Sequence, residues 1–286
     1  MAASKLVSFL RTYKQNDMAV LGLVILGFSC ALAVLAPVIS PYDPFEQTNK
    51  LFSPPNLEHP FGTDNLGRDV LSRVVWGTRV SLLFGFGVAG ISLALGIVLG
   101  AIPGYFGGLV DDLFSRFFEI YLMIPTLVLI ILIISIFGTN LFFIMIIVGV
   151  TLWPSNARIT RAQVLALKSR AFVQASVGSG ASHLRVIFTH ILPNGIYPVI
   201  VNSTLQMGNA ILTEASLSFL GLGDVNQVSW GQILYVAQFH VKTAWWMAVF
   251  SGFAIMMLVL CFNLVGDGIN FVMNPRLRRR TGDAGS

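Results

Sequence analysis

The sequence predicts an all-α, polytopic membrane protein, and three observations support this. Of the 286 residues, 55% are hydrophobic and only 11% are charged, whereas a soluble domain has about 25% charged residues. The mean hydropathy is high, at +0.77. Uncharged runs recur along the chain, each longer than the roughly 20 apolar residues that cross a bilayer, at 18–42, 80–110, 120–157, 191–213 and 243–266. This composition argues against a soluble enzyme.

The run at 120–157 is too long for one crossing. Its 38 uncharged residues would form about 57 Å of helix, nearly twice the thickness of a hydrocarbon core. We expect a reversal at Gly138-Thr139-Asn140, because Gly and Asn tolerate the backbone of a tight turn. The predicted spans are then six, at about 18–39, 80–103, 114–137, 140–157, 194–213 and 244–270.

The first apolar run has an alternative interpretation as a cleaved signal peptide. Lys5, Arg11 and Lys14 precede it, and Ala31-Leu32-Ala33 resembles a cleavage site. Its apolar stretch is longer than the roughly 7 to 15 residues of a signal peptide, which favours a retained anchor.

The orientation follows from the positions of Lys and Arg, which concentrate on the cytoplasmic side of membrane proteins. If the N-terminus is cytoplasmic, 13 of the 18 basic residues lie inside. Both termini and the segment 155–192 are then predicted to be cytoplasmic. The predicted organisation is a cytoplasmic arm (1–17), the first span with an extracytoplasmic connection (18–79), a transmembrane core containing the cytoplasmic loop 155–192 (80–272), and a basic cytoplasmic tail (273–286).

The two outer segments differ in composition. Six prolines in and next to 40–79 predict an extended, turn-rich connection. In 214–243, Trp230, Leu234, Ala237 and Val241 recur at helical spacing, which predicts a short helix on the membrane surface.

A glycine-rich segment, Gly85-Phe86-Gly87-Val88-Ala89-Gly90, matches the dinucleotide-binding fingerprint. That fingerprint needs a preceding strand and a water-accessible helix start, whereas these glycines lie inside a predicted span. On a helix, small residues form a stripe that permits close approach of another helix. The stripe consists of Gly85, Ala89, Ser92, Gly96 and Gly100.

Motifs for catalysis or nucleotide binding are missing from the sequence. It contains no HExxH, GxSxG or CxxC motif and no Gly-Lys dipeptide, so it has no P-loop lysine. We therefore expect no enzymatic activity, no cofactor and no metal. The net charge of +5 is accounted for by topology, so we expect no nucleic-acid partner.

The loop 155–192 carries five basic residues and an apolar helical pattern. Phe172, Ala175, Ser176, Ser179 and His183 share one face at spacings of three and four, with small residues that permit a partner to approach. Gly178 and Gly180 are expected to end this helix. From the residues alone, a partner-binding helix and a basic loop held to anionic headgroups both remain open.

At this loop the sequence resembles the permease subunits of binding-protein-dependent ABC importers. Gln174-Ala175-Ser176, Gly180 and His190-Ile191-Leu192-Pro193 match that family's cytoplasmic signature with its spacing intact. Gln, Ser and His replace the usual Glu, Ala and Ile. Four further segments resemble the dipeptide, oligopeptide and nickel branch. These are 61–73, 104–108, 212–223, and 262–268 together with 275–278.

The resemblance implies a type I importer permease in the cell membrane, paired with a homologous second permease as a heterodimer. It also implies two ATP-binding subunits and an extracytoplasmic substrate-binding protein. The cargo would be dipeptides or oligopeptides, with oligosaccharides or nickel as alternatives, moved by alternating access. The residues that would couple to the ATPase are Arg170, Phe172, Gln174, Ala175, Ser176, Gly180, His183, Leu184 and Pro193.

Two other functions are weighed against this one. An ion-coupled secondary transporter is suggested by Glu119, Glu214 and Asp267, but these lie near predicted span ends, where solvation at the interface explains them. A membrane-embedded enzyme lacks a nucleophile and base pair. The residues that line the substrate path are not predicted.

Overall fold

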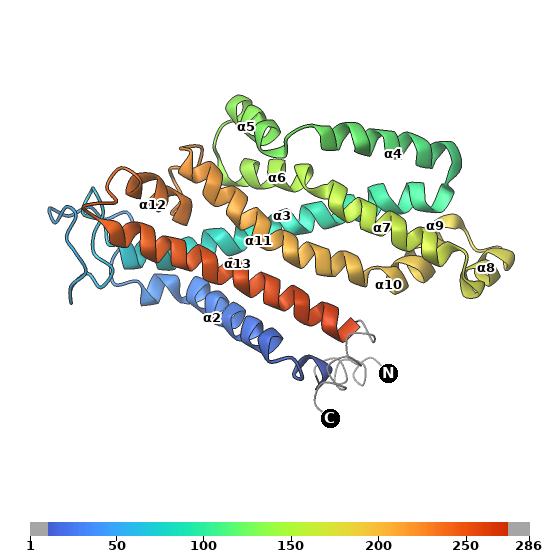
Figure 1. Cartoon of the computed structure of the whole chain (residues 1–286), viewed down its shortest axis with the longest axis horizontal. Coiled ribbons are helices and arrows are strands. Elements are labelled where there is room, and N and C mark those ends of the chain that lie inside the picture. The colour runs from blue at the N-terminus through green and yellow to red at the C-terminus, as the bar shows by residue number, and fades with distance from the viewer. Residues whose placement is uncertain (1–10, 274–286) are drawn as a thin grey trace.

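The computed structural model describes residues 11–273, and its regular elements there are helices (Figure 1). The predicted basic tail therefore lies outside the described residues, as does most of the N-terminal arm. The elements are α2 (Asp17–Ile39), α3 (Val70–Phe106), α4 (Gly108–Met123), α5 (Thr126–Phe137), α6 (Leu141–Thr151), α7 (Trp153–Lys168), α8 (Ala171–Gly178), α9 (His183–Arg185), the π-helix η1 (Val186–Ile191), α10 (Leu192–Gly195), α11 (Tyr197–Phe219), α12 (Trp230–Ala237) and α13 (Trp245–Met273).

The prediction of six spans agrees with these helices. Four stretches are long and apolar enough to cross a membrane, namely α2, α3, α6 with α7, and α13, and the number rises to six if each of two bent pairs is one span. The ends of α2 and α13 fall within a few residues of the predicted limits. Other boundaries are wrong, because α3 begins at Val70 and the helix predicted to end at 157 continues to Lys168.

The predicted span at 114–137 is not a single straight helix. The chain forms α4 and α5 instead, which meet at an angle of 81°. Ile124 has an extended backbone, with φ −82° and ψ 123°, and Pro125 follows it. A residue before proline is disfavoured in the α region, so the helix ends there.

The predicted span at 194–213 also belongs to a bent pair. The helical stretch from His183 to Gly195 meets α11 at 64°, and α11 extends to Phe219. Part of the first stretch is the π-helix η1, which sequence reasoning did not predict.

Helix α3 lies at the centre of the fold, and its small-residue stripe packs as predicted. All five members of the stripe are buried. A Cβ added to Gly96 would lie 2.3 Å from Asn156 Cβ, and one added to Gly100 would lie 2.3 Å from the Ala157 carbonyl oxygen. The two glycines therefore permit α7 to cross α3 in backbone contact, as the helix-packing interpretation requires.

A buried polar cluster ties α3, α7 and α11 together. Asn156 Nδ2 donates to Ser92 Oγ at 3.1 Å and to Gln206 Oε1 at 2.9 Å. Ser92 Oγ donates to the same Gln206 oxygen at 2.9 Å, and Asn202 Nδ2 donates to Asn156 Oδ1 at 2.8 Å. Because these groups satisfy each other away from water, they hold the three helices in one arrangement.

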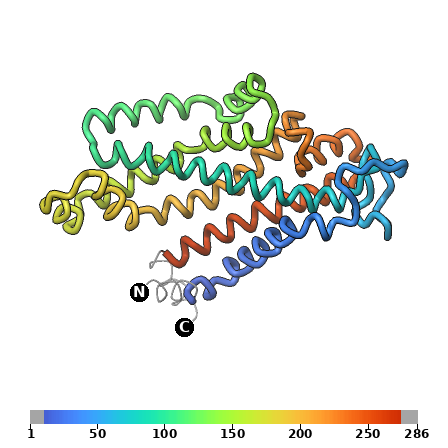
Figure 2. The backbone as a smooth tube through the Cα atoms, turned by 180° about the vertical axis from the view of Figure 1, so that it is seen from behind, coloured from blue at the N-terminus to red at the C-terminus, as the bar shows by residue number. Residues whose placement is uncertain are grey.

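The two ends of the molecule carry different segments (Figures 1 and 2). Helices α8 and α9 lie at one end, toward which the start of α2 and the end of α13 also point. Helix α12 and the segment 40–69 lie at the opposite end. No helix occurs in 40–69, as the prolines predicted. The arrangement is compatible with the predicted topology, in which both chain ends and the loop share one side.

The prediction of a surface helix near 230–241 is partly wrong. Helix α12 ends at Ala237, so Val241 lies beyond it. Trp230 is only 2% exposed, and its Nε1 donates to the Val74 carbonyl oxygen at 2.9 Å. The apolar face of α12 thus packs on the protein, against α3, α11 and α13, instead of on lipid.

Candidate functional site

Helix α8 forms a projecting tip at one end of the molecule (Figure 1). Arg170 precedes it with an extended backbone, φ −72° and ψ 144°. The Arg170 carbonyl oxygen accepts hydrogen bonds from the N–H groups of Val173 at 3.0 Å and Gln174 at 3.1 Å. Gln174 Nε2 donates to the Lys168 carbonyl oxygen at 2.8 Å, which fastens the start of α8 to the end of α7.

Val173 anchors α8 to the body of the protein. Its side chain is 0% exposed and belongs to an apolar cluster with Tyr105 of α3, Val164 of α7 and Ile187 of η1. Sequence reasoning missed this residue, because it followed the opposite face of the helix. Helical spacing gave little signal for it, since Val177, four positions further along, is 40% exposed. Helix α8 is therefore in direct packing contact with α3, α7 and η1.

The end of α8 is a Schellman turn. The N–H of Ala181 donates to the Ser176 carbonyl oxygen at 3.2 Å, and the N–H of Gly180 donates to the Val177 carbonyl oxygen at 2.9 Å. Gly180 has φ +81°, and a Cβ there would meet nothing within 4 Å. Glycine is therefore required at this position for its backbone conformation and not for space, and the predicted helix end is confirmed.

The predicted position of His183 on the face of α8 is wrong. The turn at Gly180 places His183 on the separate helix α9. There, His183 Nδ1 lies 3.0 Å from Tyr105 Oη, and its ring also contacts Phe106, with ring centroids 5.7 Å apart. A cavity of about 320 Å³ lies among these residues, Lys168 and α8.

Most residues predicted to couple are accessible to a partner. Phe172 is 45% exposed and Leu184 is 67% exposed. Ser176 is half-buried, and the remaining exposed residues are Arg170, Gln174, Ala175, Gly180, His183 and Pro193. The positions from Arg170 to Gly180 form one continuous surface, whereas Pro193 lies on α10, beyond η1. Exposed apolar side chains beside polar ones mark sites of contact with another protein or with the membrane.

The basic residues near this surface have different surroundings. Arg161 pairs with Asp111 of α4, with Nη2 to Oδ2 at 2.6 Å. Lys168 Nζ lies 5.6 Å from the centre of the Tyr105 ring. Arg158, Arg170 and Arg185 are exposed. Arg161 is thus already paired with an acidic residue of its own chain, whereas the three exposed arginines are more available to a partner.

The acidic residues considered for ion coupling do not cluster. Glu119 and Asp267 are exposed. Glu214 is only 3% exposed and accepts a hydrogen bond from Ser218 Oγ at 2.7 Å, so the prediction that it is solvated at the interface is wrong. Within residues 11–273, no group of three or more His, Cys, Asp or Glu side chains is arranged to hold a metal ion.

The helices long and apolar enough to cross a membrane fit a transmembrane transport subunit, and the comparison with known families defines which class of subunit it is. The chain belongs to the family described as "binding-protein-dependent transport system inner membrane component", whose profile matches residues 96–279. Residues 4–57 match the N-terminal transmembrane domain of oligopeptide transport permease C. The chain is accordingly a multi-pass inner-membrane permease subunit, and in its family ATP is hydrolysed by partner ATPase subunits.

Curated relatives cover nearly the whole chain. The dipeptide transport system permease protein DppC of Alkalihalophilus pseudofirmus is 39% identical over 93% of this chain and 88% of its own length. The oligopeptide transport system permease protein OppC of Haemophilus influenzae is 38% identical, over 94% of this chain and 88% of its own. Among solved structures, a chain of the MetNI methionine ABC transporter covers 71% of this chain and 97% of its own, with a TM-score of 0.57 and 20% identity. That similarity supports the fold.

Proposed function

We propose that this chain moves dipeptides and oligopeptides across the membrane as one half of a heterodimeric permease. A substrate-binding protein delivers the peptide outside, and two ATP-binding subunits drive the cycle from the cytoplasm. The peptide cargo is supported by the relatives named for dipeptide and oligopeptide transport. Oligosaccharides or nickel are the alternative cargoes.

The observation that carries the coupling role is the exposed tip of α8 on a buried anchor. Phe172 presents an apolar ring outward while Val173, its neighbour, is packed against α3, α7 and η1. A partner that binds Phe172 therefore acts on a helix that is packed directly against α3, α7 and η1. ATP-driven closure of the ATPase subunits would push or pull this surface.

The packing beneath α8 supports a rigid response. Glycine contacts join α3 to α7, and the Asn156 cluster joins both to α11. Elements held together in this way move as a body instead of bending, which suits rocking between inward-open and outward-open states. The breaks at Ile124 and between α10 and α11 are positions where such motion is absorbed.

The test uses the full complex reconstituted in proteoliposomes, with its second permease, ATPase subunits and binding protein. We expect uptake of radiolabelled dipeptides and tripeptides. This uptake should require ATP on the side of the membrane that carries the ATPase subunits. Phe172→Ala is expected to reduce the amount of ATPase that copurifies and to reduce uptake in parallel. Phe239→Ala is the matched control, because Phe239 is an exposed ring beyond α12, at the opposite end.

Three outcomes contradict parts of the proposal. Uptake that continues without ATP and is abolished by a protonophore would favour the ion-coupled alternative. A complex that hydrolyses ATP and imports nickel or an oligosaccharide, but no peptide, would reject the cargo. Equal copurification of the ATPase with Phe172→Ala and Phe239→Ala would reject the role of α8.

A further inference from the structure

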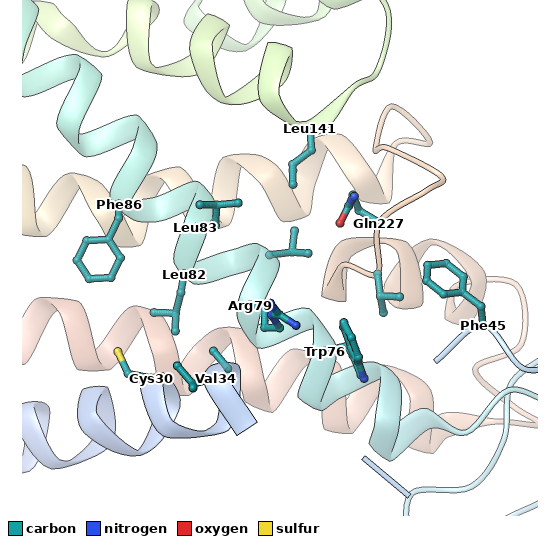
Figure 3. Close-up of a pocket in the computed structure, with 13 residues that line it drawn as sticks. Cys30, Val34, Phe45, Trp76, Arg79, Leu82, Leu83, Phe86, Leu141 and Gln227 are labelled. Carbon is teal, nitrogen blue, oxygen red and sulfur yellow. The ribbon is translucent and has the colours of Figure 1, made fainter. Parts of the chain in front are cut away.

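A cavity of about 710 Å³ lies beside the first half of α3 (Figure 3), the half that lies farther from α8 in Figure 1. Its walls include the second half of α2, which contributes Cys30 and Val34, and the first half of α3, which contributes Trp76, Arg79 and Phe86. The coupling role of α8 makes no use of this cavity. In the predicted topology it lies at the outer end of the spans.

Besides Cys30 and the Gln227 amide, which both donates and accepts, the polar side chains of the cavity wall are two donors, Arg79 and Trp76. Arg79 is exposed, and no salt bridge in residues 11–273 involves it. Its Cζ lies 5.1 Å from the centre of the Trp76 ring. The Trp76 Nε1 atom is buried and has no hydrogen-bond partner among the described residues. A buried N–H without a partner is uncommon in proteins, and a ligand that accepts from it would supply the missing hydrogen bond.

Among the residues that the structure describes, no Asp or Glu lines the cavity. Asp224 precedes the lining residue Gln227 by three positions, but both of its oxygens are engaged. Oδ2 accepts from the Leu141 N–H at 3.0 Å and Oδ1 from the Asn226 N–H at 3.0 Å. The cavity thus combines one cation without a salt bridge, one N–H donor without a partner, the Gln227 amide and mainly apolar walls. Such a site suits an anion that also carries apolar groups.

We propose that this cavity receives the carboxylate end of a peptide as it enters the permease, with Arg79 as the residue that binds the carboxylate. A guanidinium group matches the two oxygens of a carboxylate in a fork geometry, and the apolar walls accommodate the neighbouring side chain. Trp76 holds the guanidinium over its ring and donates from Nε1. This inference rests on the proposed peptide cargo and names the first group of the cargo that this subunit contacts.

The native Cys30 offers a direct binding assay, because it lines the cavity. The other cysteine, Cys261, is buried, and its thiol donates to the Gly22 carbonyl oxygen at 3.2 Å. Alkylation of Cys30 by N-ethylmaleimide would be followed by mass spectrometry in the reconstituted complex without binding protein. The probes are alanyl-phenylalanine and its C-terminal amide, both at millimolar concentration, in vesicles of phosphatidylcholine alone.

We expect the free acid to slow alkylation of Cys30 at about one tenth of the concentration that the amide requires, the ratio typical of one charged hydrogen bond. Arg79→Gln should remove that difference, and Arg79→Lys should retain part of it. Trp76→Phe keeps the ring but removes the N–H, and should weaken protection by the acid. Lys242→Gln is the charge control, since Lys242 is exposed and outside the cavity wall, and should change nothing.

Equal protection by the acid and the amide would overturn the proposal. So would protection that appears only when phosphatidylglycerol is added to the vesicles, because Arg79 would then bind a lipid headgroup. The two proposals also fail separately. If Arg79→Gln changes neither the protection of Cys30 by the free acid nor ATP-driven peptide uptake, only the proposed carboxylate site is rejected. If the wild-type complex shows protection of Cys30 but no peptide uptake, only the proposed transport function is rejected.

Discussion

The crossing of α3 and α7 gives a quantitative prediction for Gly96→Ala. The new methyl group would lie 2.3 Å from Asn156 Cβ and 3.0 Å from the Ala157 backbone N. Neither atom is at the end of a flexible side chain, so the two helices must move apart. Overpacking of this kind costs about 1 to 3 kcal/mol, while alanine gains about 1 kcal/mol over glycine in helix propensity.

Gly90→Ala is the matched control, because Gly90 lies on the same helix and a Cβ there meets nothing within 4 Å. The propensity gain is common to both variants, so their difference isolates the packing. We expect Gly96→Ala to unfold with a free energy about 2 kcal/mol lower than Gly90→Ala.

The assay is reversible unfolding of the purified subunit in mixed micelles, with increasing fractions of sodium dodecyl sulfate and fluorescence detection. If the two variants unfold at the same detergent fraction, α3 and α7 do not meet in backbone contact at Gly96. The stripe would then lack the role assigned to it.

Three further predictions concern other contacts. Gly180→Ala forces a left-handed backbone on a residue with a Cβ, at a cost of about 1 to 2 kcal/mol. ATP-driven uptake by this variant should fall at unchanged membrane abundance, whereas the control Gly178→Ala should transport normally. Equal uptake by the two variants would contradict the Schellman turn. Asp111→Asn should lower the free energy of unfolding by about 1 kcal/mol, and a double-mutant cycle with Arg161→Gln checks this, with zero coupling as the contrary result. Asn156→Ala removes hydrogen bonds to two helices and should lower the free energy of unfolding by about 1 kcal/mol in the same assay. An unchanged free energy of unfolding would mean that the polar cluster does not hold the helices together.

The helices were predictable because hydrocarbon excludes unpaired backbone groups, so a long uncharged run must be helical. Their ends were less predictable. Helix α3 starts at Val70, where the Asp69 carboxylate accepts from the Ser72 N–H at 2.7 Å, and this cap lies outside the apolar run that located the span. The break at Ile124 had a local signal in Pro125, which the prediction of a span at 114–137 did not use.

The candidate site was predictable in composition but not in arrangement. Small and apolar residues at helical spacing indicated an accessible helix around Phe172, and the structure has one there. Extending that spacing to His183 failed, since periodicity applies only within one helix and Gly180 reverses the chain. The contact of His183 with Tyr105 joins residues 78 positions apart, and no local pattern reports such a pair.

Photo-cross-linking from position 172 tests the central claim most directly. A photoreactive phenylalanine analogue at position 172, and the same analogue at position 239 as control, would be irradiated in the assembled complex with and without ATP. The account predicts a cross-link from position 172 to an ATPase subunit, with a yield that changes when ATP binds, and none to that subunit from position 239. Cross-links from position 172 to lipid alone, or labelling of α8 from the outer side of intact cells, would contradict it.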